Sequence, residues 1–171
     1  SAHEKQENVY AALEKLGSII SAGKVSFWIS ETNGENKWYL WEEGKPIKKY
    51  RETNGQKNAG KLKEFFSAGN GVYESWDEKE FREIFPVEEL PDIYNVMAVP
   101  VEGVGGHICG ILAAYNVKDG HEQIALLKNI QFSFGMFCNN LKNYTDIQEQ
   151  GNRDTLTGLY NRNRYERDLS E

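Results

Sequence analysis

Two apolar segments decide the fold of this chain: Val96-Met97-Ala98-Val99-Pro100-Val101 and Ile108-Cys109-Gly110-Ile111-Leu112-Ala113-Ala114-Tyr115-Asn116-Val117. Each is a nearly continuous apolar run of strand length, which predicts a strand covered on both faces. The glycine-rich stretch 102–106 between them makes a compact turn. We therefore expect both strands near the centre of a sheet that helices flank. Pro100 lacks an N–H for the ladder, so it predicts a strand end or a bulge.

The residues before these strands change from a helical to a strand period. Val9, Leu13, Leu16 and Ile20 recur at spacings of three and four, which predicts a helix over about 3–21. Alternating residues over 25–30, the turn 32–34 and a second run over 38–41 predict a hairpin. The remaining expected elements are a weak strand over 47–51, helices over 61–68 and 77–85, and a short strand over 72–76.

Residues 121–153 predict one helix that is long for a globular domain. Its apolar positions recur at spacings of three and four: Ile124, Leu127, Ile130, Phe134, Phe137, Leu141 and Tyr144. We expect the first half to pack on the sheet and the second half to project and pair with a second copy. The predicted dimer residues are Phe134, Phe137, Leu141 and Tyr144. A helix packed wholly on its own domain is the alternative interpretation.

This order of elements is typical of a layered α+β domain. The strand over 96–101, the glycine-rich turn, and the strand from Cys109 to Asn116 that leads to a helix are similar to those of GAF domains. The resemblance implies a central antiparallel sheet flanked by helices, with a long C-terminal linker helix. We divide the chain into a GAF-like sensor domain with its N-terminal helix over 1–140, a signalling helix over 121–153 that overlaps it, and a further segment over 154–171.

In GAF domains the ligand cavity lies on one face of the sheet, closed by the segments between the middle strands. By that resemblance the candidate pocket walls are Trp28, Tyr73, Trp76, Tyr94, His107 and Cys109. Aromatic walls with a few polar tips suit an unidentified small organic ligand. The alternative is a packed core with amphipathic rings at its margin. The signature of cyclic-nucleotide-binding GAF domains and the bilin-linking cysteine of phytochromes are not found.

His107 and Cys109 stand two apart on a predicted strand, so we expect them on the same face. Such a pair could bind a metal, but the sequence offers no third ligand, and packing explains both residues more simply. We assign no metal site and no catalytic residue, and the sequence requires no cofactor.

The stretch Asp154-Thr-Leu-Thr-Gly-Leu-Tyr-Asn-Arg162 resembles the opening of the GGDEF domain, which makes cyclic di-GMP from two GTP molecules. The matching positions are Asp154, Leu156, Thr157, Gly158, Leu159, Asn161 and Arg162. By this resemblance they couple the helix to the output domain, and residues 154–171 are its truncated start. GTP and magnesium are expected only for the missing GGDEF domain. The fragment itself is expected not to be an enzyme, and the full-length protein to be a diguanylate cyclase.

Composition narrows the remaining classes of function. A net charge of −6 argues against binding nucleic acid or an anionic membrane surface over the whole protein, and no apolar run reaches the length of a membrane helix. We expect a cytoplasmic regulatory domain that senses a small molecule and forms homodimers through its terminal helices. The alternative is a ligand-free dimerisation module that holds two output domains together.

Overall fold

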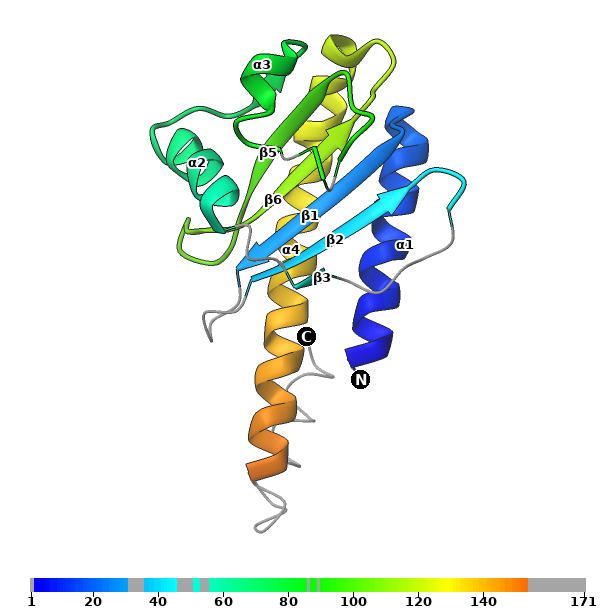
Figure 1. The fold of residues 1–171 in the computed structure, drawn as a ribbon. Helices are drawn as coiled ribbons and strands as arrows, with labels where there is room; N and C mark the ends of the chain where they lie inside the picture. The colour runs from blue at the N-terminus through cyan, green and yellow to red at the C-terminus, as the bar shows by residue number, and fades with distance from the viewer. Residues whose placement is uncertain are drawn as a thin grey trace.

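The chain folds into a sheet with two helices against each face (Figure 1). The computed structural model describes the backbone of residues 2–30, 36–45, 51–52, 56–85, 87–88 and 90–153. Side chains are described for residues 7–30, 36–45, 59–85, 87–88 and 90–136. Helices α1 (Ala2–Ile20) and α4 (Gly120–Arg153) lie on one face, while α2 (Gln56–Ser67) and α3 (Glu78–Phe81) lie on the other. These layers confirm the predicted α+β architecture.

The described strands form one antiparallel sheet in the order β3-β2-β1-β6-β5-β4. Two hairpins, β1–β2 and β5–β6, are joined by the pairing of β1 with β6 at the centre. The two apolar runs are therefore internal strands, as predicted. The strands are β1 (Lys24–Ser30), β2 (Asn36–Glu42), β3 (Arg51–Glu52), β4 (Tyr73–Ser75), β5 (Val96–Glu102) and β6 (Ile108–Tyr115). The predicted strand over 47–51 lies mostly outside the described residues.

The core on the α1/α4 face confirms the helical stripe of the N-terminal segment. Val9, Leu13, Leu16 and Ile20 are at most 2% exposed and pack on the sheet. Helix α4 contributes the buried Leu127 and Phe134 to the same core. Thirty-four residues at about 1.5 Å each give α4 a length of roughly 51 Å. It continues well past the edge of the sheet (Figure 1).

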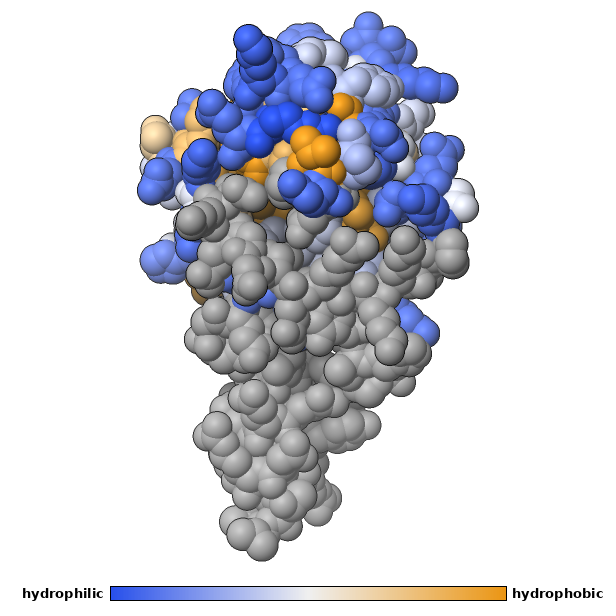
Figure 2. Space-filling model, viewed as in Figure 1, coloured by the Kyte–Doolittle hydropathy of each residue, from blue (hydrophilic) through white to orange (hydrophobic). Residues whose placement is uncertain are grey.

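The core on the α2/α3 face is richer in aromatic rings. Phe66 of α2 and Phe81 of α3 are buried there with the strand residues of the same face. The carboxylate of Asp77 accepts a hydrogen bond from the Lys79 N–H at 3.0 Å and so caps α3. In the view of Figure 2, hydrophobic side chains appear as small areas separated by polar ones. Both helices thus bury their apolar sides against the sheet.

Pro100 stands inside β5, opposite Ile111, and not at a strand end or in the bulge. The prediction for this residue was wrong because β4 is short. Strand β4 pairs only with Val96, Met97 and Ala98, so the part of the chain that the structure describes provides no partner strand for the outer side of β5 at Pro100. A missing N–H therefore costs no ladder bond on that side. The Pro100 carbonyl instead accepts a hydrogen bond from Gln131 Nε2 of α4 at 2.7 Å.

Gly135 lies at a close approach between α4 and strand β5. A Cβ atom added there would lie 2.9 Å from the backbone oxygen of Glu102, whereas one added at Gly60 of α2 would meet nothing within 4 Å. We expect Gly135→Ala to lower the free energy of unfolding by about 1–3 kcal/mol, because helix or strand must shift. We expect Gly60→Ala to raise it by about 0.5–1 kcal/mol, because alanine favours helix. Urea unfolding of both variants checks this, and stabilisation by Gly135→Ala would contradict the close approach.

Candidate functional site

The six predicted pocket residues do not form one pocket. Trp28 and Tyr73 are buried together in the core on the α2/α3 face. Trp76 and Tyr94 are 51% and 56% exposed at the end of the sheet where α4 begins. His107 is exposed in the β5–β6 turn, and Cys109 packs against the core on the opposite face. Only the first pair lies where the GAF resemblance places a ligand cavity.

A β-bulge explains why Cys109 faces the other way. In the β5–β6 ladder Val101 pairs with Gly110 and Glu102 with Ile108, which leaves Cys109 as an extra residue. The bulge breaks the alternation of faces, so Ile108 packs on the α2/α3 side and Cys109 on the α1/α4 side. The thiol donates a hydrogen bond to the Val101 carbonyl, with Sγ 3.4 Å from the oxygen. His107 precedes β6 and lies in the turn, so the expectation that His107 and Cys109 share a strand face was wrong.

The described side chains offer no group of three His, Cys, Asp or Glu residues that could hold a metal ion. His121 does approach an acid, with Nδ1 3.4 Å from a carboxylate oxygen of Glu74, but this pair is at the surface.

Small residues form the floor of the α2/α3 face. Tyr73 of β4, Ala98 of β5, Ala113 of β6 and Ser26 of β1 pair in one row across four adjacent strands. In the next row Trp28 pairs with Trp38 of β2. The small side chains in the middle of this row therefore lie between Tyr73 at one end and the tryptophans Trp28 and Trp38 near the other.

Aromatic rings cover this floor. The Tyr115 hydroxyl lies 2.7 Å from Ser26 Oγ, and both groups are buried. The Phe85 ring meets the Tyr115 ring edge-on at 5.5 Å between centroids and lies 6.4 Å from the Tyr73 ring. Flat aromatic surfaces and few polar atoms are what pockets for planar organic molecules offer.

One buried donor on this face, Trp28 Nε1, has no hydrogen-bond partner among the residues that the structure describes, and its residue is 8% exposed. A buried donor without an acceptor costs about 1–3 kcal/mol, so a folded domain seldom keeps one without a reason. Another buried atom, Arg82 Nε, also lacks a hydrogen bond but lies 3.6 Å from a Glu78 carboxylate oxygen.

The Tyr73 hydroxyl keeps its proton throughout the physiological range. Burial, which disfavours the phenolate, and the nearby Glu80 carboxylate raise the pKa of Tyr73 to about 12. Hydrogen bonding with the side chains of Ser75 and Glu80 also shifts this pKa, Ser75 lowering it and Glu80 raising it. Ser75 Oγ in turn donates to Glu80 Oε2 at 3.2 Å, so the protonated Tyr73 hydroxyl belongs to a small polar group with these two side chains.

Arg82 holds the segment that follows α3 against this core. Its guanidinium donates to the carbonyls of Leu90 and Pro91 at 2.6 and 2.9 Å and lies over the Phe81 ring. Sequence reasoning missed this role, since the partners are eight and nine residues away and belong to no motif.

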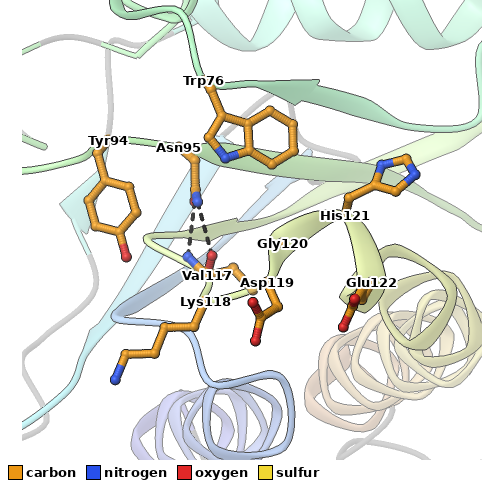
Figure 3. Close-up of a pocket in the computed structure, with 9 residues that line it drawn as sticks. All are labelled: Trp76, Tyr94, Asn95, Val117, Lys118, Asp119, Gly120, His121 and Glu122. Atoms are coloured by element: carbon orange, nitrogen blue, oxygen red, sulfur yellow. Dashed lines mark hydrogen bonds between the residues drawn. The ribbon is translucent and has the colours of Figure 1, made fainter.

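An open cavity of about 410 Å³ lies where α4 begins (Figure 3). Trp76 and Tyr94 stand at its sides, and the first turn of α4 forms one wall. The Trp76 ring lies against Gly120, the first residue of α4, because a Cβ atom there would be 3.2 Å from Trp76 Cζ2. The Trp76 side chain, which directly follows β4, therefore contacts the start of α4.

Asn95 and Asn116 hold the floor of this cavity in place. The Asn95 amide donates to the Val117 carbonyl at 3.0 Å and accepts from the Val117 N–H at 2.9 Å. Asn116, at φ 56°, accepts from the Tyr94 N–H and donates to the Asp92 carbonyl. These bonds fasten the segment before β5 to the one after β6. Nothing in the sequence indicates these bonds beyond the two asparagines next to strands.

Phe134 belongs to the core and not to a dimer surface. It is 5% exposed, and its ring lies 5.4 Å from that of the buried Phe27. The exposed apolar residues of this part of α4 are instead Phe132 and Met136, at 82% and 63%. The assignment of Phe134 as a dimer residue was wrong, because at this point of α4 its side chain faces the sheet of its own domain. The side chains of Phe137, Leu141 and Tyr144, and the coupling residues from Asp154 to Arg162, lie outside the described residues.

Comparison with solved structures identifies the fold as GAF-like. The chain is similar to the photoproduct state of GAF3 from Slr1393 of Synechocystis sp. PCC6803, at 17% identity and a TM-score of 0.58, covering 84% of this chain and 99% of that one. It is also similar to the red/green cyanobacteriochrome NpR6012g4 in its red-light-absorbing state, at 15% identity and a TM-score of 0.57. This match covers 80% of this chain and 95% of that one. The type II free methionine-R-sulfoxide reductase from Thermoplasma acidophilum is similar at 19% identity and a TM-score of 0.51. This match covers 75% of this chain and 87% of that one.

No family model and no curated protein matches the sequence. None of the described helices is both long and apolar enough to cross a bilayer.

Proposed function

We propose that this chain is the regulatory part of a diguanylate cyclase, in which a small molecule bound on the α2/α3 face controls a downstream GGDEF domain through α4. The observation that carries ligand binding is Trp28 Nε1, a buried donor on this face for which the described residues offer no hydrogen-bond partner. The GAF-like fold and the GGDEF-like stretch from Asp154 support the rest. The proposed setting is the cytoplasm, and the chain itself performs no catalysis.

Strand β4 connects the proposed ligand site to the output helix. Tyr73 lies in the ligand-facing core, and Trp76, three residues later, packs on Gly120 at the start of α4. A ligand that engages Tyr73 can therefore bias the position of β4 and, through Trp76, the α4 helix. The ligand must bind one helix arrangement more tightly than the other, since equal affinity shifts no population.

Native mass spectrometry of the purified chain is the direct test of ligand binding. An added mass on each protomer that is lost in the double variant Trp28→Phe/Tyr73→Phe supports the proposal. In the full-length protein, Trp76→Ala is expected to retain the bound molecule while losing its effect on cyclic di-GMP synthesis. Deletion of 154–162 is expected to uncouple sensing from output, and unchanged ligand-dependent activity in that deletion would contradict the coupling role.

Helix α4 is the proposed dimer contact, with Phe132 and Met136 in place of Phe134. The two exposed side chains stand four residues apart and so form one apolar strip on the helix. We expect Phe132→Glu/Met136→Glu to weaken dimerisation at least about tenfold, because the strip would carry like charges in both copies. Analytical ultracentrifugation measures this. Lys63→Glu, on exposed α2, is the control, and an equally dimeric double variant would exclude this strip.

A ligand-free dimerisation module is the second candidate, favoured by the direct packing of Phe85 on Tyr115 over the sheet floor. It predicts bare dimers in native mass spectrometry that survive dilution.

An enzymatic function has little support. One similar structure is a methionine-R-sulfoxide reductase, but the Cys109 thiol packs against an apolar core and donates to a carbonyl, which disfavours the reactive thiolate.

A further inference from the structure

The open cavity at the start of α4 offers a binding site that shares no lining residue with the core on the α2/α3 face. We infer that this cavity takes a small organic cation of the quaternary ammonium class, held against the Trp76 and Tyr94 rings. The inference goes beyond the proposed function, since it concerns a second site and does not depend on a ligand of the α2/α3 face.

Two large aromatic side chains line the cavity and remain about half exposed. Trp76 and Tyr94 stand on either side of the opening, with Asn95 between them (Figure 3). The volume of about 410 Å³ falls within the roughly 300–1,000 Å³ that is usual for small-molecule sites. Both rings therefore leave apolar surface in water that a ligand of modest size can cover.

The backbone that carries the two rings is held in place without a ligand. The Tyr94 N–H donates to Asn116 Oδ1 at 2.8 Å. On either side of Trp76, Ser75 Oγ accepts a hydrogen bond from the Asp77 N–H at 3.1 Å. Because these segments are already ordered, binding at the rings costs little additional backbone entropy.

The charges of the lining favour a cation. Two carboxylates, Asp119 and Glu122, line the cavity together with one ammonium, Lys118. Neither carboxylate forms an ion pair with another of the described residues. In the view of Figure 3, Lys118 extends away from Trp76. The positive end of the α4 dipole opposes a cation, but the two carboxylates stand at that same end and offset it.

Aromatic faces and carboxylates together select the kind of cation. The face of an aromatic ring attracts positive charge, and tryptophan does so most strongly. A quaternary ammonium presents methyl groups to such a face, whereas a primary ammonium is compact and strongly hydrated. A neutral compound of the same shape would gain only the apolar contact, and an anion would be repelled by the carboxylates.

Three compounds of nearly equal shape test the inference: choline, the neutral 3,3-dimethyl-1-butanol and the anion 3,3-dimethylbutanoate. Binding is followed by the indole N–H signals in ¹H–¹⁵N spectra of the whole chain, with Trp76 assigned from Trp76→Leu. We expect choline to move the Trp76 signal and to bind about three- to tenfold more tightly than the alcohol. The carboxylate is expected to bind most weakly.

Two variants separate the ring from the charge, with binding followed at the Gly120 amide. Trp76→Leu is expected to bind choline about three- to tenfold more weakly, because the aromatic face is lost. Asp119→Asn keeps a residue that tolerates the φ of 54° and is expected to weaken choline binding about two- to threefold, while binding of the alcohol stays the same. Glu64→Gln, an exposed acid on α2, is the control and is expected to change nothing.

Equal binding of choline and the alcohol, or tighter binding of the carboxylate, would overturn the inferred cation. A Trp76 signal that does not move in tens of millimolar choline would overturn the site itself. None of these probes tests the α2/α3 face, so either result leaves the proposed function to be judged by native mass spectrometry.

Discussion

Replacing Phe134 by alanine is expected to lower the free energy of unfolding by about 3–5 kcal/mol. The Phe134 ring is 5% exposed and meets the fully buried Phe27 of β1 edge-on, so its removal leaves a cavity between α4 and the sheet. Urea unfolding followed by circular dichroism measures the change. Helix α4 forms the C-terminal part of the proposed signalling path. Loss of the Phe134 ring should also weaken the packing of the first half of α4 on the sheet.

The matched control is Phe132→Ala, two residues earlier on the same helix. Phe132 is 82% exposed, so we expect its substitution to change stability by no more than about 0.5 kcal/mol at concentrations where the chain is monomeric. Equal losses in the two variants would show that the rotation of α4 about its axis differs from that described.

Asn95→Ala is expected to lower the free energy of unfolding by about 2–4 kcal/mol. The side chain is 2% exposed and satisfies both the N–H and the C=O of Val117, which is itself buried, so alanine leaves two backbone groups unpaired. Thermal and urea unfolding both report the loss.

Asn70→Ala is the comparison for this prediction. Asn70 also donates from its amide to a backbone carbonyl, that of Phe65 at 2.8 Å, but it does so at the surface. Water can replace that bond, and the cost should stay below about 1 kcal/mol. Similar costs for both asparagines would mean that water reaches Val117.

The regular elements could be predicted from the sequence because burial repeats with the period of the backbone. The spacing of Val9, Leu13, Leu16 and Ile20 fits only one buried face of a helix, and all four residues are buried. The apolar runs of β5 and β6 likewise indicated central strands. Where two stripes share one helix, as with Phe134 and Phe132 on α4, the period alone does not tell which one faces the sheet.

The candidate site was less predictable because it depends on contacts between distant segments. One extra residue at Cys109 changes which face a side chain takes, and no local pattern marks the bulge. Asn95 meets Val117 across 22 residues. Trp28 and Tyr73, two of the predicted pocket residues, lie in one aromatic cluster. That Trp28 Nε1 lacks a hydrogen-bond partner among the described residues became evident only from the three-dimensional arrangement.

The pairing of β1 with β6 at the centre of the sheet has a consequence for how the chain folds over time. The two hairpins are local and can form early, but the Ser26–Tyr115 contact closes a loop of 89 residues. Closing such a loop late makes folding slow for the size of the domain. During synthesis, β1 keeps an unpaired edge until β6 has left the ribosome, and a nascent chain that stalls before residue 108 would present that edge to other chains.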